Sequence, residues 1–179
     1  RIQGGNKLKG EIIPQGAKNE ALQIIAAVLL SPEPITINKI PNIRDVNKLI
    51  ELVGDLGTKV EKLGAESYRF TAKDLDVSFL ETKEFKTKAA SLRGSIMILG
   101  PLLARYGYAK IPRPGGDKIG RRRLDTHFIG FEKLGAKFNY SKKDAFYKID
   151  AHDLNGCYMH LDEASVTGTA NILMAAVLA

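Results

Sequence analysis

The chain has 179 residues, 44% hydrophobic and 26% charged, which is enough to build one good core in a water-soluble domain. No apolar run is long enough to span a bilayer, the N-terminus lacks the apolar core of a signal peptide, and a lone Cys157 excludes an internal disulfide. The net charge of +7 and the isoelectric point near 9.4 indicate an anionic partner. Aromatic residues are not interleaved with the cations, so a small anion is favoured over nucleic acid. We therefore expect a cytoplasmic protein with no membrane or nucleic-acid partner.

Three segments are apolar on nearly all sides and rich in alanine. They contain Ile24–Leu29, Lys88–Arg105 and Leu173–Leu178. Helices of this composition are expected to be buried rather than amphipathic. Gly16-Ala17-Lys18-Asn19 precedes the first of them, and Lys18 at a helix start is either an exposed loop lysine or a cation beside backbone N–H groups that favour an anion.

An internal repeat follows from the spacing of the remaining elements. An amphipathic helix ending at Leu56 is followed by Gly57 and by strands over 58–63 and 68–72. The same order returns in a helix from Leu124 to Leu134, a glycine, and strands over 136–140 and 147–151. Leu56 and Leu134 are 78 residues apart, whereas Ala72 and Ala151 are 79 apart, which indicates one inserted residue. Each unit is predicted to be a buried helix, a strand, an amphipathic helix and a hairpin.

The segment from Pro112 to His127, PRPGGDKIGRRRLDTH, carries the densest chemistry. A Pro-Gly-Gly turn presents Asp117 as an acid, and four cations follow: Lys118, Arg121, Arg122 and Arg123. Asp125 is available as the N-cap of the next helix. A glycine-rich loop that leads into a helix beside clustered arginines can bind phosphate or carboxylate, but it can equally be a solvated basic loop.

Other candidate residues are more isolated. Arg93 lies in an apolar segment, so it either reaches the surface or meets an anion in a cleft. Ser165 and Val166 precede the last helix, where serine is an ordinary cap. The three histidines, including His127, are too scattered for a metal site, and Cys157 is most simply a buried thiol in a strand.

The motifs GAKN and PGGDKIG-x-RR-x-D-x-H together resemble the UDP-N-acetylglucosamine 1-carboxyvinyltransferase family, an enolpyruvyl transferase family. The chain departs from the family pattern at Asp117, where cysteine is usual, at Arg123, where proline is usual, and at Thr167, where glycine is frequent. The resemblance implies an inside-out α/β barrel of repeated βαβαββ units with helices inside and sheets outside. Residues 1–17 would then be a strand of a second, missing domain. Residues 18–179 would be about two and a half repeats of the present domain, truncated at the C-terminus.

The resemblance also implies a reaction and a site. The enolpyruvyl group of phosphoenolpyruvate would be transferred to the 3-hydroxyl of UDP-N-acetylglucosamine, releasing phosphate, in the first committed step of peptidoglycan synthesis. This step serves cell-wall growth, cell shape and division. No cofactor or metal is implied. Asp117 would be the catalytic acid, and the general base would lie in the missing domain. The implied substrate contacts are Lys18, Asn19, Arg93, Arg122, Arg123, Leu124, Asp125, Thr126, Ser165 and Val166.

Two consequences concern Asp117. Fosfomycin inactivates this family by alkylating the loop cysteine, so an aspartate there implies resistance. The four neighbouring cations should lower the pKa of Asp117, whereas an acid that works near neutrality needs a raised pKa. Closure of the loop over substrate phosphate would reverse that balance. Two alternatives stay open: an enolpyruvylshikimate phosphate synthase-like transferase, although that family typically has Lys-Ser after the GA position, and a non-catalytic basic module that binds nucleotide or nucleic acid.

Overall fold

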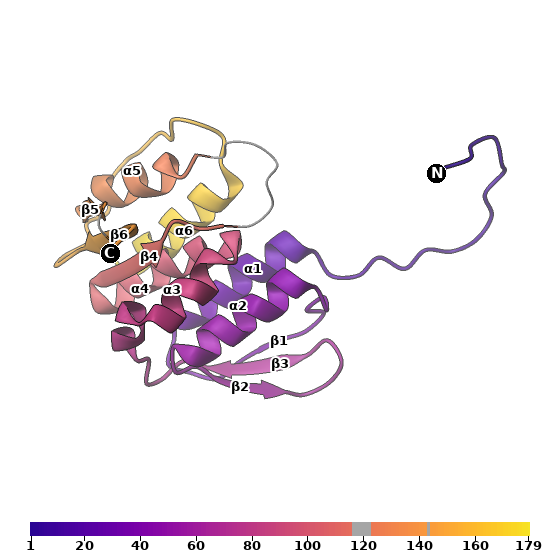
Figure 1. Cartoon of the computed structure of the whole chain (residues 1–179), viewed down its shortest axis with the longest axis horizontal. Coiled ribbons are helices and arrows are strands. Elements are labelled where there is room, and N and C mark those ends of the chain that lie inside the picture. Colours follow the sequence, from indigo (N-terminus) through magenta and orange to yellow (C-terminus); the bar gives the residue numbers. More distant parts are fainter. Residues whose placement is uncertain (116–122, 143) are drawn as a thin grey trace.

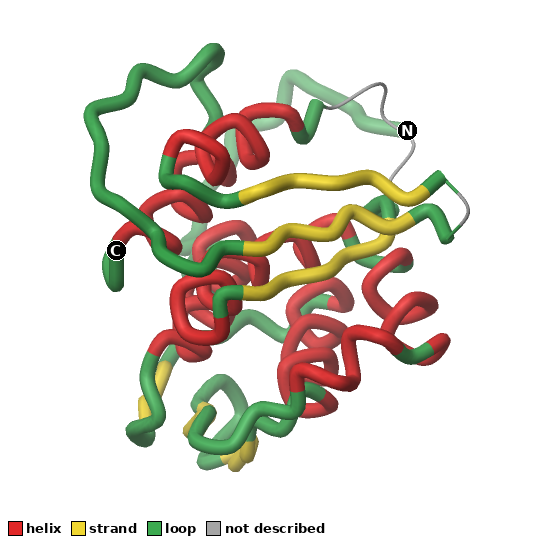
Figure 2. Tube along the Cα trace, turned by 90° about the vertical axis from the view of Figure 1, so that its left-hand side faces the viewer, coloured by secondary structure: helices red, strands yellow, loops and turns green. Residues whose placement is uncertain are grey.

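Two three-stranded sheets lie at the periphery of the molecule, and helices fill the space between them (Figure 1). The structure is a computed structural model that describes residues 1–115, 123–142 and 144–179. Figure 2 looks at the left side of Figure 1 and shows one sheet in front of the helices. This arrangement, with helices inside and sheets outside, is the α/β architecture that the family resemblance implies.

The elements repeat in chain order. The first unit comprises α1 (Lys18–Ala27), η1 (Val28–Leu30), β1 (Ile35–Ile37), α2 (Arg44–Asp55), β2 (Lys59–Lys62) and β3 (Tyr68–Thr71). The second comprises η3 (Arg93–Ile98), α4 (Leu99–Tyr106), β4 (Tyr108–Pro112), α5 (Asp125–Lys133), β5 (Lys137–Ser141) and β6 (Phe146–Asp150). Between the units lie η2 (Val77–Glu81) and α3 (Lys83–Ala90), and α6 (Val166–Ala176) follows the second. The strand orders β1-β3-β2 and β4-β6-β5 are equivalent, and every pairing is antiparallel.

The repeat extends to single backbone positions. Gly57 and Gly135 follow α2 and α5 with φ of 101° and 100°, a left-handed conformation that favours glycine. A Cβ at Gly57 would also lie 2.6 Å from the carbonyl oxygen of Asp74. The next residues, Thr58 and Ala136, donate to carbonyls inside the preceding helices at 3.1 and 3.0 Å. The two helix ends are therefore built alike, as the offset of the sequence repeat predicts.

The prediction of one continuous helix from Lys88 to Arg105 is wrong, because the segment is divided into α3, η3 and α4. Helix α3 ends at Ala90, and Leu92 takes an extended conformation with φ −134° and ψ 122° before η3 begins. The buried hydroxyl of Ser95 lies 2.8 Å from Ala89 O and 2.6 Å from Leu92 O, so its single proton is shared between two carbonyls at the break. Serine bonds of this kind compete with regular helix, and propensity scales do not report them.

Helix α6 packs against both α4 and α1, and α4 is the most enclosed of the three. Its residues from Leu99 to Leu103 are all buried. The expectation that the apolar segments are buried rather than amphipathic is wrong for α6. Leu173 and Val177 are 64% exposed on one face of that helix, and no described residue covers them.

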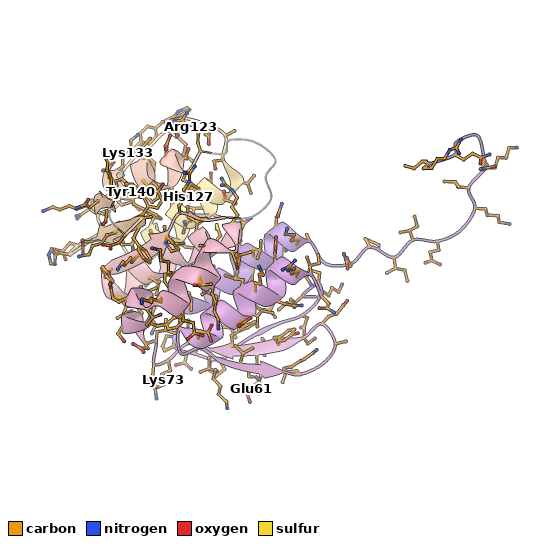
Figure 3. All side chains as sticks on the ribbon, viewed as in Figure 1. Glu61, Lys73, Arg123, His127, Lys133 and Tyr140 are labelled. Carbon is orange, nitrogen blue, oxygen red and sulfur yellow. The ribbon has the colours of Figure 1, made fainter. Side chains whose placement is uncertain are left out.

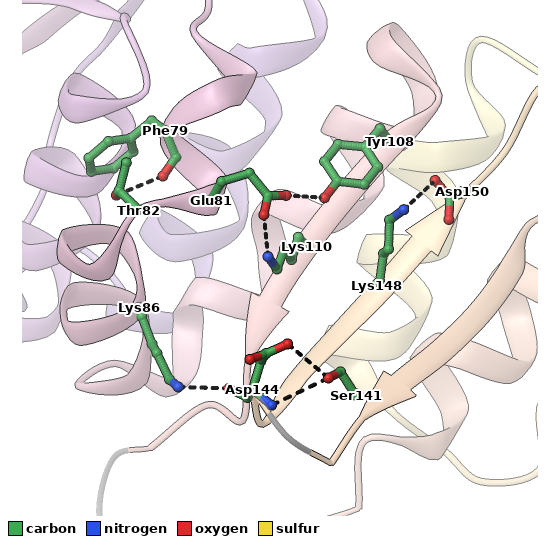
Figure 4. A network of polar contacts seen from close by, with 10 residues as sticks. All are labelled: Phe79, Glu81, Thr82, Lys86, Tyr108, Lys110, Ser141, Asp144, Lys148 and Asp150. Carbon is green, nitrogen blue, oxygen red and sulfur yellow. Dashed lines mark hydrogen bonds and ion pairs between the residues drawn. The ribbon is translucent and has the colours of Figure 1, made fainter.

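The segment between the two units is fastened to the second sheet (Figure 4). The Glu81 carboxylate accepts from the Tyr108 hydroxyl at 2.5 Å and pairs with the Lys110 ammonium, both on β4. The hydrogen bond from Lys110 lowers the pKa of Glu81. Lys86 on α3 donates to the backbone of Asp144 in the β5–β6 hairpin at 2.7 Å. These contacts tie η2 and α3 to the sheet that carries the second unit.

Residues 1–17 contain no helix or strand and extend away from the packed elements (Figure 1). Ile2, Leu8, Ile12 and Ile13 are 85% or more exposed. This segment therefore contributes nothing to the core of the described chain.

Candidate active site

A cavity of about 560 Å³ opens where α1, η3 and the starts of α5 and α6 converge. Predicted substrate contacts from four separate segments line it: Lys18, Asn19, Arg93, Arg123, Leu124, Ser165 and Val166. In the sequence they span nearly the whole chain, so only the fold brings them together. Their convergence makes this cavity the candidate active site.

Lys18 and Asn19 form the first turn of α1, directly after Ala17, whose side chain provides no cap. The N–H groups of this turn lack helical partners, so the turn attracts negative charge. The Lys18 ammonium lies 2.5 Å from the carboxylate of Asp45, the second residue of α2. Both side chains are about a third exposed, which makes the pair weak enough to exchange for a ligand.

Arg93, the first residue of η3, is half-buried and lies on the cavity wall. Its guanidinium donates to the carbonyl oxygen of Arg123 at 3.3 Å, which links η3 to the residues that lead into α5. Arg93 therefore lies in the cleft rather than extending into open solvent.

Arg123 pairs with two carboxylates, Asp125 at 2.8 Å and Asp162 at 3.2 Å. The bond to Asp125 is the main reason that the pKa of Arg123 is raised. The expectation that Asp125 caps α5 is wrong: the helix begins at Asp125, Leu124 is its N-cap residue, and the Asp125 carboxylate binds Arg123 instead.

Asp125 and Thr126 lie beside the cavity rather than on it. Asp125 lines a separate hollow of about 360 Å³ with Phe138 and Tyr147. Thr126 is buried, and its hydroxyl donates to Asp162 Oδ1 at 2.8 Å. These contacts hold the segment 162–163 against the start of α5.

Ser165 caps α6, accepting from the backbone N–H of Gly168 at 3.1 Å. The Ser165 side chain is therefore a helix cap, as serine at this position predicts. The residue also borders the cavity. Gly168 is required by close packing, because a Cβ there would lie 2.9 Å from Thr126 Cγ2. Val166 is exposed at the cavity edge.

His127 reaches the cavity wall from α5, close to Arg123 (Figure 3). The residue is 3% exposed. Its Nδ1 lies 3.0 Å from Asn171 Nδ2, and its Nε2 lies 3.5 Å from Thr167 Oγ1. Burial, followed by the positive charge of Arg93, lowers the pKa of His127 to about 4. The imidazole is therefore neutral near pH 7.

Several cavity residues were not predicted as site residues. They are Gln23, Asp45, His127, Glu163 and Thr167. Gln23 follows Asn19 by four residues, a helical spacing that places both on one face and could have indicated it. Asp45 reaches the cavity only because α2 packs on α1, and nothing near it in the sequence indicates this. Asp117, Lys118, Arg121 and Arg122 lie outside the described residues.

Cys157 contradicts the prediction of a buried thiol in a strand. It is exposed and lies in the irregular segment between β6 and α6. Met159 and Leu161 are partly buried and His160 between them is exposed, an alternation typical of a strand, but the pairings of the described strands do not include this segment. Among the described residues, no group of three or more His, Cys, Asp or Glu side chains could hold a metal ion. Within the same residues, no helix combines the length and apolar character needed to cross a membrane.

Comparison with known proteins defines the class. The family described as EPSP synthase (3-phosphoshikimate 1-carboxyvinyltransferase) matches residues 2–179, so the chain belongs to this family of carboxyvinyl transferases. The enolpyruvyl transferase NikO from Streptomyces tendae shares the fold, with a TM-score of 0.74 and 19% identity, over 96% of this chain and 39% of that one. EPSP synthase from Acinetobacter baumannii gives a TM-score of 0.65 at 15% identity, over 93% and 37%.

Sequence similarity is much higher to one member of the class. UDP-N-acetylglucosamine 1-carboxyvinyltransferase from Bacteroides fragilis is 60% identical over 99% of this chain and 41% of that protein. The protein of the same name from Porphyromonas gingivalis is 53% identical over the same shares. The chain thus spans about two fifths of the length of these relatives.

Proposed function

We propose that the chain is part of a longer enzyme that transfers the enolpyruvyl group of phosphoenolpyruvate to the 3-hydroxyl of UDP-N-acetylglucosamine and releases phosphate. The observation that carries this proposal is the convergence of Lys18, Arg93 and Arg123 on one cavity. The chain that forms this cavity is 60% identical to a UDP-N-acetylglucosamine 1-carboxyvinyltransferase. Such an enzyme would act in an early, cytoplasmic step of peptidoglycan synthesis, a pathway that serves cell shape and division.

The transfer is an addition followed by an elimination. The sugar hydroxyl gives its proton to the general base and adds to the central carbon of phosphoenolpyruvate, while the methylene carbon gains a proton from the acid. Loss of a proton from the resulting methyl group then breaks the bond between the central carbon and the phosphate oxygen, which releases phosphate. Both substrates are anionic, so cations must neutralise charge that is concentrated at the phosphate groups. Lys18, Arg93 and Arg123 supply cations from three segments, and Arg122 adds one from the loop. Asp117 takes the role of the acid that exchanges the methylene proton.

Residues 1–17 are proposed to belong structurally to a second domain, and residues 18–179 to the present one. The exposed side chains of Ile2, Leu8, Ile12 and Ile13 support this, because apolar side chains on an extended segment are suited to pack on another surface. That domain would also supply the general base. The 179-residue chain alone should therefore bind the sugar nucleotide weakly and not turn over.

The test is phosphate release by the complete protein mixed with phosphoenolpyruvate and UDP-N-acetylglucosamine. Shikimate 3-phosphate, offered as the acceptor in a parallel reaction, tests the enolpyruvylshikimate phosphate alternative. Arg93→Ala should lower kcat/KM about ten- to a hundred-fold, as expected for loss of a charge-assisted contact. Arg69→Ala on the exposed face of β3 is the matched control and should behave as the parent. The proposal would be refuted if the protein used shikimate 3-phosphate but not UDP-N-acetylglucosamine as acceptor, or if it used neither.

A further inference from the structure

Asn171 on α6 is fully buried and joins three elements. Its Oδ1 accepts from the backbone N–H of Gly100 at 2.8 Å, and its Nδ2 donates to the carbonyl of Ile96 at 2.9 Å. A backbone N–H can only donate and a carbonyl can only accept. These two bonds therefore fix which end of the amide carries the oxygen and which carries the nitrogen.

The orientation of the amide determines the protonation of His127. Once one proton of Nδ2 binds Ile96, the other faces His127 Nδ1 across 3.0 Å. Nδ1 can accept that proton only if it carries none itself. The single proton of the neutral imidazole must then lie on Nε2, the ring nitrogen beside Thr167.

The same geometry places that proton at the cavity. His127 and Thr167 both line it, and the Thr167 hydroxyl, at 3.5 Å, is a distant partner that a ligand oxygen could replace. We propose that Asn171 is a positioning residue that locks neutral His127 in the Nε2–H tautomer, so that the ring donates a hydrogen bond to an anionic oxygen of the bound substrate. The identity of that substrate rests on the proposed function, whereas the tautomer does not.

Gly100 makes the arrangement possible. A Cβ at this position would lie 2.2 Å from the Asn171 carbonyl oxygen and 2.7 Å from Oδ1. Only glycine lets α6 approach α4 closely enough for the amide to reach the backbone. The tautomer is thus set by close contact between two helices, and neutral imidazole keeps a directed donor where a charged one would be costly to bury. The lowered pKa of His127 is consistent with this neutral form.

The direct test is the ¹⁵N spectrum of the complete protein labelled at histidine, recorded near pH 7 without substrate. The His127 signals are assigned by their loss in His127→Gln. Nδ1 should show the shift of an unprotonated nitrogen and Nε2 that of a protonated one. The opposite pattern would overturn the proposal. This result does not depend on any activity, so it stands or falls separately from the proposed function.

The role of Asn171 is tested by Asn171→Asp. A carboxylate cannot donate, so His127 must protonate Nδ1 and present a bare Nε2 to the cavity. In the ¹⁵N spectrum, Nδ1 of His127 should now show the shift of a protonated nitrogen and Nε2 that of an unprotonated one. Calorimetry should show that UDP-N-acetylglucosamine binds at least about tenfold more weakly. Ile172→Ala, a neighbouring buried position on α6, is the control and should keep the wild-type signals. An unchanged tautomer in Asn171→Asp, or an inverted tautomer with unchanged affinity, would contradict the assignment. The wild-type spectrum decides the tautomer even if this variant fails to fold.

Discussion

Acidification should weaken this fold through His127, because the folded and unfolded states bind its proton with different affinities. The pKa of His127 is about 4 in the folded chain, lowered from 6.5 by burial and by Arg93. Between these values the unfolded state binds the proton and the folded state does not, so the free energy of unfolding decreases as the pH falls. At about 1.36 kcal/mol per pKa unit, the loss between pH 7 and pH 4 is about 3 kcal/mol. Well below pH 4 both states are protonated, and this contribution changes no further.

The assay is urea denaturation of the chain at several pH values, compared with His127→Gln, which retains a donor and an acceptor but does not titrate. Carboxylates also contribute. The pKa of Glu81 is lowered by its bond to Lys110, so its stabilising contribution is present at neutral pH and is lost in acid. That loss is common to both proteins and cancels in the difference. Wild type should therefore lose about 3 kcal/mol more than the variant between pH 7 and pH 4. Equal losses would show that His127 is not held neutral by burial.

Four further outcomes are expected. Gly130→Ala should lower the free energy of unfolding by about 1–3 kcal/mol, because the new Cβ would lie 2.1 Å from Ile172 Cδ1, and adding Ile172→Val should recover part of the loss in denaturation curves. Ser165→Ala should cost about 1 kcal/mol through loss of the cap, while Ser165→Thr keeps most of the stability. In the complete protein, Arg122→Ala should lower kcat/KM about ten- to a hundred-fold with a nearly unchanged Tm; parental activity would favour a solvated loop. Fosfomycin should inactivate Asp117→Cys with time but not wild type, since a thiolate is a far better nucleophile than a carboxylate; equally fast alkylation of wild type at Asp117, seen by mass spectrometry, would refute its role.

The repeat could be predicted from the sequence because its signals are local. Gly57 and Gly135 end equivalent helices, and alternation of apolar residues places the following strands to within one or two residues. The break at Leu92 could not be predicted in this way. It depends on where the Ser95 hydroxyl finds carbonyls and on the burial of Leu92 against other helices. Apolar composition alone predicts one continuous helix here, because it carries no information about such a break.

The residues of the candidate site also fall into two groups, those that the sequence could indicate and those that it could not. Lys18 and Arg93 were identified through motifs or an unusual charge in an apolar segment, and the fold brings them to one cavity. Asp45 and Asn171 carry no such signal, because their importance comes from partners far away in the sequence. Asn171 contacts His127 from 44 residues away, and only the packing of α6 on α4 and α5 defines its bonds. Residues that act through a partner are visible only once the partner is placed.

The cations of the cavity are oriented by carboxylates that hold them weakly. Lys18 pairs with Asp45, and Arg123 with Asp125 and Asp162, yet each of these side chains is at least a quarter exposed. Exposed pairs of this kind contribute about 0–1 kcal/mol each, so a phosphate oxygen can replace a carboxylate at little cost. The pairs still reduce the freedom of two long side chains before the ligand arrives. Arg93 also donates to the backbone carbonyl of Arg123, and that bond does not compete for negative charge. Two cations of the cavity, Lys18 and Arg123, can therefore exchange their carboxylate partners for a ligand. This arrangement suits the proposed transfer, in which two anionic substrates bind and phosphate is released at every turnover.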